Sequence, residues 1–169
     1  MEDTTSSPSR SVSRRALVKG AAWSVPVIAV AAATPLAAAS TATNVGDFAL
    51  NGTCGVLGLI GPGFTLTAGS APLPAGTIVN VTGSGIANIG VFSVTGGTAT
   101  VNVLSGTSRQ ITLTAPLAAG ATIDFRTTLS ITVAFTLSAS TTLPSGFVAG
   151  GGAKQTGGVS STLILCSAS

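Results

Sequence analysis

The segment from Ile123 to Leu137 alternates between apolar and polar residues, and this regularity limits the possible folds more than any other feature. All but one of its odd-numbered residues are apolar, and all but one of its even-numbered residues are polar. Side chains of a β-strand alternate between two faces, so one face is predicted to be buried and the other solvated. Because strands rarely exceed about 10 residues, we expect a bend or a change of sheet near Thr127.

Shorter alternating runs recur between residues 48 and 169, separated by glycine, proline, serine and asparagine. Phe48 and Leu50 would begin the first strand, and Leu163 and Leu165 would end the last. The apolar residues predicted to face inward from the strands between them are Phe64, Leu66, Val79, Val81, Ala99, Val101, Val103, Ile111 and Leu113. About nine such strands predict an all-β fold, a two-sheet immunoglobulin-like sandwich.

Glycines mark two irregular points in this pattern. Between residues 89 and 94 the inward parity changes from Ile89 and Val91 to Phe92 and Val94, which predicts a bulge at Gly90. The pair at positions 96 and 97 predicts a tight hairpin turn into the next strand.

The sequence also contains one short internal repeat. Residues 71–76 (APLPAG) and 115–120 (APLAAG) each follow an alternating run and precede another. A single short internal repeat does not indicate a solenoid. It predicts two similar connections within one domain.

The N-terminal residues differ from the rest in charge. Four of the seven basic residues of the chain lie within the first nineteen positions. One group of these residues resembles the twin-arginine export motif, in which Ser-Arg-Arg-x precedes two apolar residues and a lysine; the matching positions are Ser13, Arg14, Arg15, Leu17, Val18 and Lys19. The apolar stretch that follows is shorter than the roughly 20 residues of a spanning helix. Residues 1–39 are therefore predicted to be a twin-arginine signal peptide with a cleavable signal helix.

Small residues predict where this signal is cleaved. Ala37 and Ala39 occupy the positions that a signal peptidase requires before a cut at Ser40. The mature chain is then expected to consist of a short polar leader, 40–47, followed by a β-sandwich domain, 48–169. It would have no stable membrane anchor. Retention of the signal as an uncleaved anchor is the alternative.

The whole chain resembles small exported proteins of high-GC Gram-positive bacteria. These combine a twin-arginine signal with one Ser/Thr/Gly/Ala-rich β-sandwich that ends in a Cys-bearing strand, here residues 163–167. The resemblance implies a secreted or cell-wall-associated protein that meets the twin-arginine translocase and a signal peptidase during export. It implies no particular activity.

Cys54 and Cys166 are the only cysteines of the chain. An even pair in an exported protein predicts a structural disulfide, which would join the first strand region to the last. A redox-active pair is disfavoured, because the close C-x-x-C spacing and a basic neighbour are both missing.

The residues after position 39 offer little for catalysis or metal binding. They include no His, Glu, Tyr, Trp or Met, and their acidic residues are Asp47 and Asp124 alone. Catalytic triads need a base such as histidine, and metal sites need clustered His, Cys or carboxylates. We therefore expect no enzyme, no metal and no cofactor. Asp124 is predicted to form a solvated surface pair with Arg126, two positions along the same strand.

Lys154 is the one lysine after the signal segment, and it lies in the Gly-rich stretch 150–158. A Ser–Lys dyad or an internal Lys–Asn isopeptide bond is disfavoured there, because a flexible loop holds a lysine poorly in a desolvated state. Three basic residues against two acidic ones after position 39 also argue against binding to nucleic acid.

Two functions remain for a chain of this kind. The first is a non-enzymatic structural or adhesive module of the cell envelope or secretome. The alternative is a secreted binding module for a glycan or protein partner, which would use the Gly-rich loops around residues 61–63 and 150–158.

Overall fold

The computed structural model describes residues 42–56, 61–163 and 165–169 and contains twelve strands there. The first six are β1 (Thr43–Asn44), β2 (Ala49–Thr53), β3 (Gly63–Thr67), β4 (Ile78–Ser84), β5 (Phe92–Thr95) and β6 (Ala99–Ser105). The others are β7 (Ser108–Leu113), β8 (Thr122–Thr127), β9 (Phe135–Thr142), β10 (Phe147–Val148), β11 (Thr156–Thr162) and β12 (Leu165–Ala168). The all-β prediction is confirmed for this part of the chain, which holds no helix.

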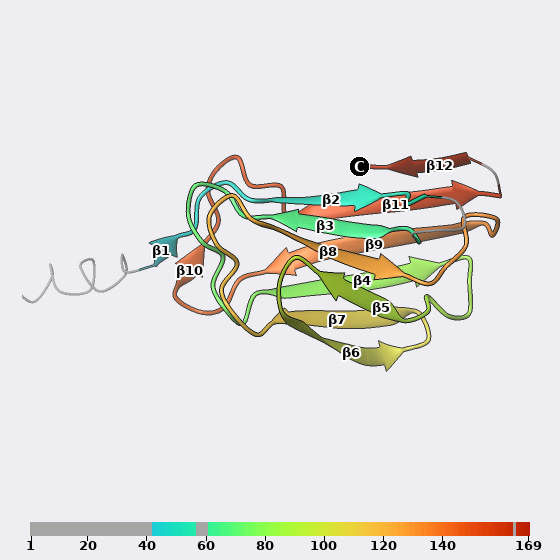
Figure 1. Cartoon of the computed structure of the whole chain (residues 1–169), viewed down its shortest axis with the longest axis horizontal. Helices are drawn as coiled ribbons and strands as arrows, with labels where there is room; N and C mark the ends of the chain where they lie inside the picture. The colour runs from blue at the N-terminus through green and yellow to red at the C-terminus, as the bar shows by residue number, and fades with distance from the viewer. Residues whose placement is uncertain (1–41, 57–60, 164) are drawn as a thin grey trace, which may run out of the picture. The chain divides into compact units, whose positions relative to one another are not determined.

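Two main sheets face each other across one apolar core (Figure 1). The smaller has four strands in the order β2-β3-β8-β5, and the larger has six in the order β12-β11-β9-β4-β7-β6. A parallel pair, β1 with β10, forms a third, two-stranded sheet. The largest fully buried side chains come from both main sheets and their connections; they include Phe48, Phe64, Phe125, Leu50, Leu66, Leu73, Ile111, Ile123 and Leu137.

The long alternating segment is not a single strand. Its first part is β8 in the four-stranded sheet, and its last three residues begin β9 in the six-stranded sheet, so the predicted change of sheet is confirmed. The buried Thr127 ends β8, where its hydroxyl donates to the carbonyl of Ile89 and accepts from the backbone N–H of Leu129 at 3.3 Å. Val133 lies exposed in the connection. Alternation therefore continues across a turn that residue polarity alone does not reveal.

The predicted hairpin at Gly96–Gly97 is wrong. These glycines lead from β5 in the four-stranded sheet to β6 in the six-stranded sheet, so the strands on either side are not paired. Gly96 has a φ of +84°, and a Cβ on Gly97 would lie 2.8 Å from the side chain of Ile123. Gly96 is the position that requires glycine, because its φ is left-handed and a Cβ there would lie 2.4 Å from the Thr122 carbonyl oxygen.

Several residues expected to face inward lie at the margins instead. Val103 is on the edge strand β6 and is 69% exposed, although Ala99 and Val101 on the same strand are half-buried. Val91 is 72% exposed, because the left-handed Gly90 changes the parity between the buried Ile89 and Phe92. Leu163, directly after β11, and Leu165, the first residue of β12, are also exposed. The other residues predicted to face inward, on β3, β4 and β7, are buried.

The two copies of the internal repeat form connections between the two sheets, and these connections pair with each other. One leads from β3 to β4 and the other from β7 to β8, so they pass between the sheets in opposite directions. At their midpoints Leu73 and Leu117 form an antiparallel bridge, with both N–H···O distances 2.9 Å. Each copy ends in a glycine with positive φ, Gly76 and Gly120.

The chain joins the fold before residue 48. Thr43 pairs with Phe147, Val45 is buried, and residues 42–169 form one compact unit. Part of the predicted leader, 40–47, thus contributes to the domain. The predicted export motif and the cleavage positions lie outside the described residues. None of the described residues belongs to a helix that could cross a membrane.

Candidate functional site

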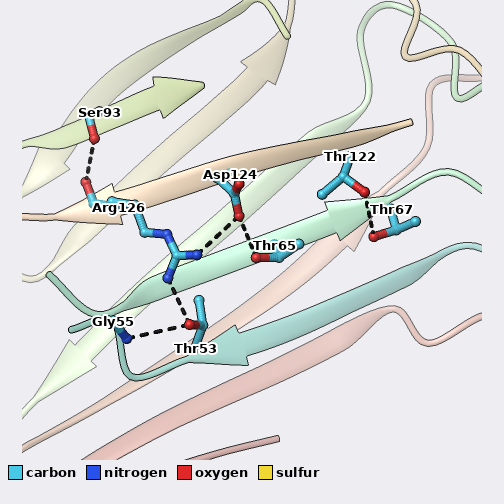
Figure 2. Close-up of polar contacts among 8 residues, drawn as sticks. All are labelled: Thr53, Gly55, Thr65, Thr67, Ser93, Thr122, Asp124 and Arg126. Carbon is cyan, nitrogen blue, oxygen red and sulfur yellow. Dashed lines mark hydrogen bonds and ion pairs between the residues drawn. The ribbon is translucent and has the colours of Figure 1, made fainter. Parts of the chain in front are cut away.

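A polar cluster lies on the outer face of the four-stranded sheet (Figure 2). Asp124 and Arg126 alternate with the buried Ile123 and Phe125 on β8, so both charged side chains point away from the core. The guanidinium of Arg126 lies 3.2 Å from the carboxylate of Asp124. The predicted surface pair is confirmed.

Neighbouring strands supply further partners to this pair. Thr65 on β3 stands opposite Asp124 in the register and donates its hydroxyl to the carboxylate at 2.5 Å. Arg126 donates to the hydroxyl of Thr53 on β2 at 2.7 Å. The cluster therefore ties three adjacent strands together, and its carboxylate and guanidinium are already engaged. Both side chains are about one-quarter to one-third exposed, so the pair stabilises the fold only weakly.

An open cleft of about 720 Å³ begins at this cluster. Its lining comes from the β2–β3 connection with Val56, Gly61 and Pro62, from residues 91–95 at β5, and from the β8–β9 connection, residues 128–131. Asp124 and Arg126 supply its charged groups. The cleft thus combines apolar side chains with serine and threonine hydroxyls and a single ion pair, which suits a neutral or mixed ligand better than a strongly charged one.

The Gly-rich stretch 150–158 is docked against β2. The backbone N–H of Gly152 donates to the carboxylate of Asp47 at 3.0 Å, and Gly150 donates to the carbonyl of Gly46 at 2.9 Å. A Cβ on Gly150 would lie 2.0 Å from an Asp47 carboxylate oxygen. Glycine is required there so that the loop can approach the carboxylate.

Lys154 lies at the end of this loop and is exposed. Its ammonium donates to the side-chain carbonyl of Asn51 at 2.7 Å. The sequence predicted that a Lys–Asn cross-link is disfavoured but did not identify Asn51 as the neighbour, since 103 residues separate the two positions. The contact is solvated, and Asp47 is engaged by Gly152, so the geometry offers a hydrogen bond and not an activated amine.

A shallower groove of about 490 Å³ crosses the outer face of the six-stranded sheet near Lys154. Hydroxyl and amide side chains of β4, β9 and β11 line it, among them Asn80, Thr82, Ser138, Ser140 and Thr156. The register places Asn80 beside Ser140, and Ser140 beside Thr156. This face can offer rows of neutral hydrogen-bonding groups.

Arg109 is a buried residue that the sequence analysis did not single out. Its guanidinium donates to the carbonyls of Gly90 at 2.8 Å and Ser108 at 2.9 Å, to the Asn88 side chain at 3.1 Å, and to the carbonyl of Ser105. These groups belong to the β4–β5 connection and the β6–β7 turn, so the arginine holds two loops together. Its parity with the buried Ile111 was the available signal.

Cys54 and Cys166 form the predicted disulfide, with their Cα atoms 5.8 Å apart. The bond joins the end of β2 to β12 across the margin of the two sheets. Among the described residues, no three His, Cys, Asp or Glu side chains gather into a metal site. The two candidate acids, Asp47 and Asp124, bind different groups: the first contacts the Gly-rich loop and the second contacts Thr65 and Arg126.

The sequence and the fold were compared with known proteins. No protein-family model, curated protein or solved structure matches the chain.

Proposed function

We propose that this chain is an exported, non-enzymatic β-sandwich protein of immunoglobulin-like type that serves as a structural or adhesive module of the cell envelope or secretome. The observation that supports this most directly is the disulfide between Cys54 and Cys166. Such bonds persist in oxidising compartments, which favours a place outside the cytoplasm.

The position of the disulfide also suits a protein under tension. Its sequence separation is 112 residues, and it joins points close to the two ends of the described domain. A force pulling on those ends would pass through the covalent bond and would not stretch the strands between the two cysteines. A structural or adhesive module benefits from such shielding.

Single-molecule pulling of the domain tests this mechanical role. Without the bridge, unfolding of the enclosed segment should lengthen the chain by on the order of 400 Å, given about 3.3–3.6 Å per extended residue. With the bridge intact, that extension should be missing. An equal extension in the oxidised and reduced protein would contradict the shielding.

Export itself rests on the resemblance of residues 13–19 to a twin-arginine motif. Replacing Arg14 and Arg15 together by lysine should leave the precursor in the cytoplasm. The partners in this step are the twin-arginine translocase and a signal peptidase, which cuts after Ala39. Unimpaired export of the double variant would exclude this route.

Cell fractionation tests the proposed location. A processed protein that stays in the wall fraction after washing with salt supports the structural or adhesive role. Accumulation of the unprocessed chain in the cytoplasm would contradict it.

The alternative, a secreted binding module, is favoured by the 720 Å³ cleft, because the Gly61–Pro62 segment forms part of its wall. Release of the protein into the medium would favour this function. Titration calorimetry against a panel of neutral oligosaccharides provides a direct test, with Arg126→Ala as the variant that should weaken binding. Unchanged binding by that variant would exclude the cleft.

A further inference from the structure

β6 is an edge strand of the six-stranded sheet. It pairs with β7 on one side, and among the described strands it has no partner on the other. Figure 1 shows it at the lower margin of the sheet, with no strand beyond it. Its outer side therefore presents free backbone donors and acceptors, which can template the addition of another strand.

The hydrogen bonds at one end of β7 show which backbone groups are free. Thr114 donates its N–H to the carbonyl of Thr98 at 3.0 Å. Leu113, one residue earlier, instead bonds through both its N–H and its carbonyl to the connection that enters β4, at Thr77 and Gly76. Since antiparallel pairs alternate between bonded and non-bonded residues, the even-numbered residues of β6 bond to β7. Ala99, Val101 and Val103 therefore direct their N–H and carbonyl groups outward.

The usual protections of an edge strand are largely missing from β6. Residues 99–105 contain no charge and no proline, either of which would discourage pairing. Val103 is 69% exposed and Leu104 is 59% exposed. The one irregularity is a shift of register between Val103 and Ser105, which ends the regular stretch at Val103. Five regular residues, 99–103, thus remain available.

We propose that β6 pairs antiparallel with β6 of a second copy of this chain, about a two-fold axis through Val101. In this register Val101 lies opposite Val101 of the other copy, and Ala99 lies opposite Val103, so all outward backbone groups find partners. Thr100 lies opposite Asn102 on the outer face. The two six-stranded sheets then form one continuous sheet.

The strand itself favours a second copy over an unrelated peptide. The free groups fall on residues of one parity, so residues 99–103 complement themselves in an antiparallel register without involving the register shift after Val103. Its valines meet valine and alanine, and no charge meets a like charge. This inference rests on the proposed structural or adhesive role and names the surface and the partner that such a role would use.

Sedimentation velocity over a range of concentrations tests the pairing. The full chain, purified with its disulfide intact, should form dimers as its concentration rises. Val103→Lys should raise the dissociation constant at least tenfold, because it adds a charge to each side of the shared edge. The matched control, Val133→Lys, replaces an exposed valine of the β8–β9 connection and should change it less than twofold. A chain that stays monomeric at all concentrations, or equal losses in the two variants, would overturn the proposal.

Cysteine cross-linking tests the register. Thr100→Cys and Asn102→Cys place thiols on residues that face each other across the proposed interface. A mixture of the two variants should yield a covalent dimer on mild oxidation, and either variant alone should not. Cross-linking of Asn102→Cys with itself, or no cross-link in the mixture, would overturn the proposed register.

These outcomes are separable from those of the proposed function. If the protein is exported and retained in the wall but stays monomeric, the pairing fails and the structural role stands. If the protein forms the dimer but remains unprocessed in the cytoplasm, the proposed function fails and the pairing stands.

Discussion

At the margin where β2 lies beside β11 and β12, main-chain hydrogen bonds and a disulfide join the two sheets, whereas β6 at the opposite margin keeps one side unpaired in the described structure. Leu50 of β2 donates its N–H to the carbonyl of Lys154, in the segment before β11, at 2.8 Å. Gln155, the next residue, bonds through its carbonyl to Thr141 of β9 at 2.8 Å. The chain thereby connects one sheet to the other at this closed margin.

The close approach of β2 to β11 at this margin also requires a glycine. Gly52 of β2 donates its N–H to the Ser169 carbonyl at 2.7 Å, and a Cβ on Gly52 would lie 1.9 Å from the Gly158 carbonyl oxygen. At the open margin, β5 and β6 are the edge strands of the two sheets, and among the described residues no strand pairing joins them. This small domain therefore concentrates its covalent and close backbone contacts on one side, which leaves the other side free for association.

Removal of the disulfide should cost the closed margin more stability than any other change considered. Replacing Cys54 and Cys166 together by serine should lower the free energy of unfolding by about 4–5 kcal/mol, because the unfolded chain regains the entropy of a loop of this length. Urea unfolding of the oxidised protein and the double variant measures this. Reductant should destabilise the parent protein and leave the variant unchanged. A loss below about 1 kcal/mol would show that the other contacts of the margin suffice.

The second prediction concerns the arginine that supports the open margin. Arg109→Met should cost about 2–4 kcal/mol, because the carbonyls of Gly90, Ser108 and Ser105 lose a buried donor. The matched control is Arg126→Met, whose parent residue forms a partly exposed pair and should cost less than about 1 kcal/mol. Thermal unfolding of both variants checks the difference, and equal losses would contradict the role of Arg109.

Local patterns in the sequence predicted the interior of the fold well. The alternation of Phe64 with Leu66 and of Ile111 with Leu113 placed these residues in the core, because burial on one face imposes a period of two on any strand. The disulfide followed from the number of cysteines and the signal motif. Both kinds of evidence depend on residue type and spacing alone.

The order of the strands was not predictable in this way. Val101 and Val103 alternate with polar residues as interior residues do. Their strand, β6, is nevertheless an edge strand, paired with β7 alone among the described strands. The hydrogen bond between Lys154 and Asn51 likewise joins residues from distant parts of the chain. Such pairings are decided by how the sheets assemble, which a single sequence does not encode in any local period.

The third prediction tests the close approach at the closed margin. Gly52→Ala should cost about 1–3 kcal/mol, because the new methyl group would collide with the Gly158 carbonyl and force the backbones apart. Gly151→Ala is the matched control, since no atom lies within 4 Å of the position its Cβ would occupy. It should leave stability unchanged or raise it by up to about 1 kcal/mol. Chemical unfolding at equilibrium measures both, and a neutral Gly52→Ala would show that the margin can relax.

The smallest effect is expected at the open margin itself. Val81, Arg109 and Val103 lie in one row across β4, β7 and β6, so the two valines differ mainly in their distance from the edge. Val81 is fully buried and Val103 is 69% exposed. Val81→Thr should cost about 1–3 kcal/mol, since a buried hydroxyl must find a partner in an apolar core. Val103→Thr should change stability by less than about 0.5 kcal/mol, as is usual for surface substitutions.

Unfolding is best measured on dilute, monomeric samples, so that pairing between copies does not contribute. A large loss for Val103→Thr under those conditions would mean that β6 is covered within the single chain, and the contrast between the two margins would then disappear.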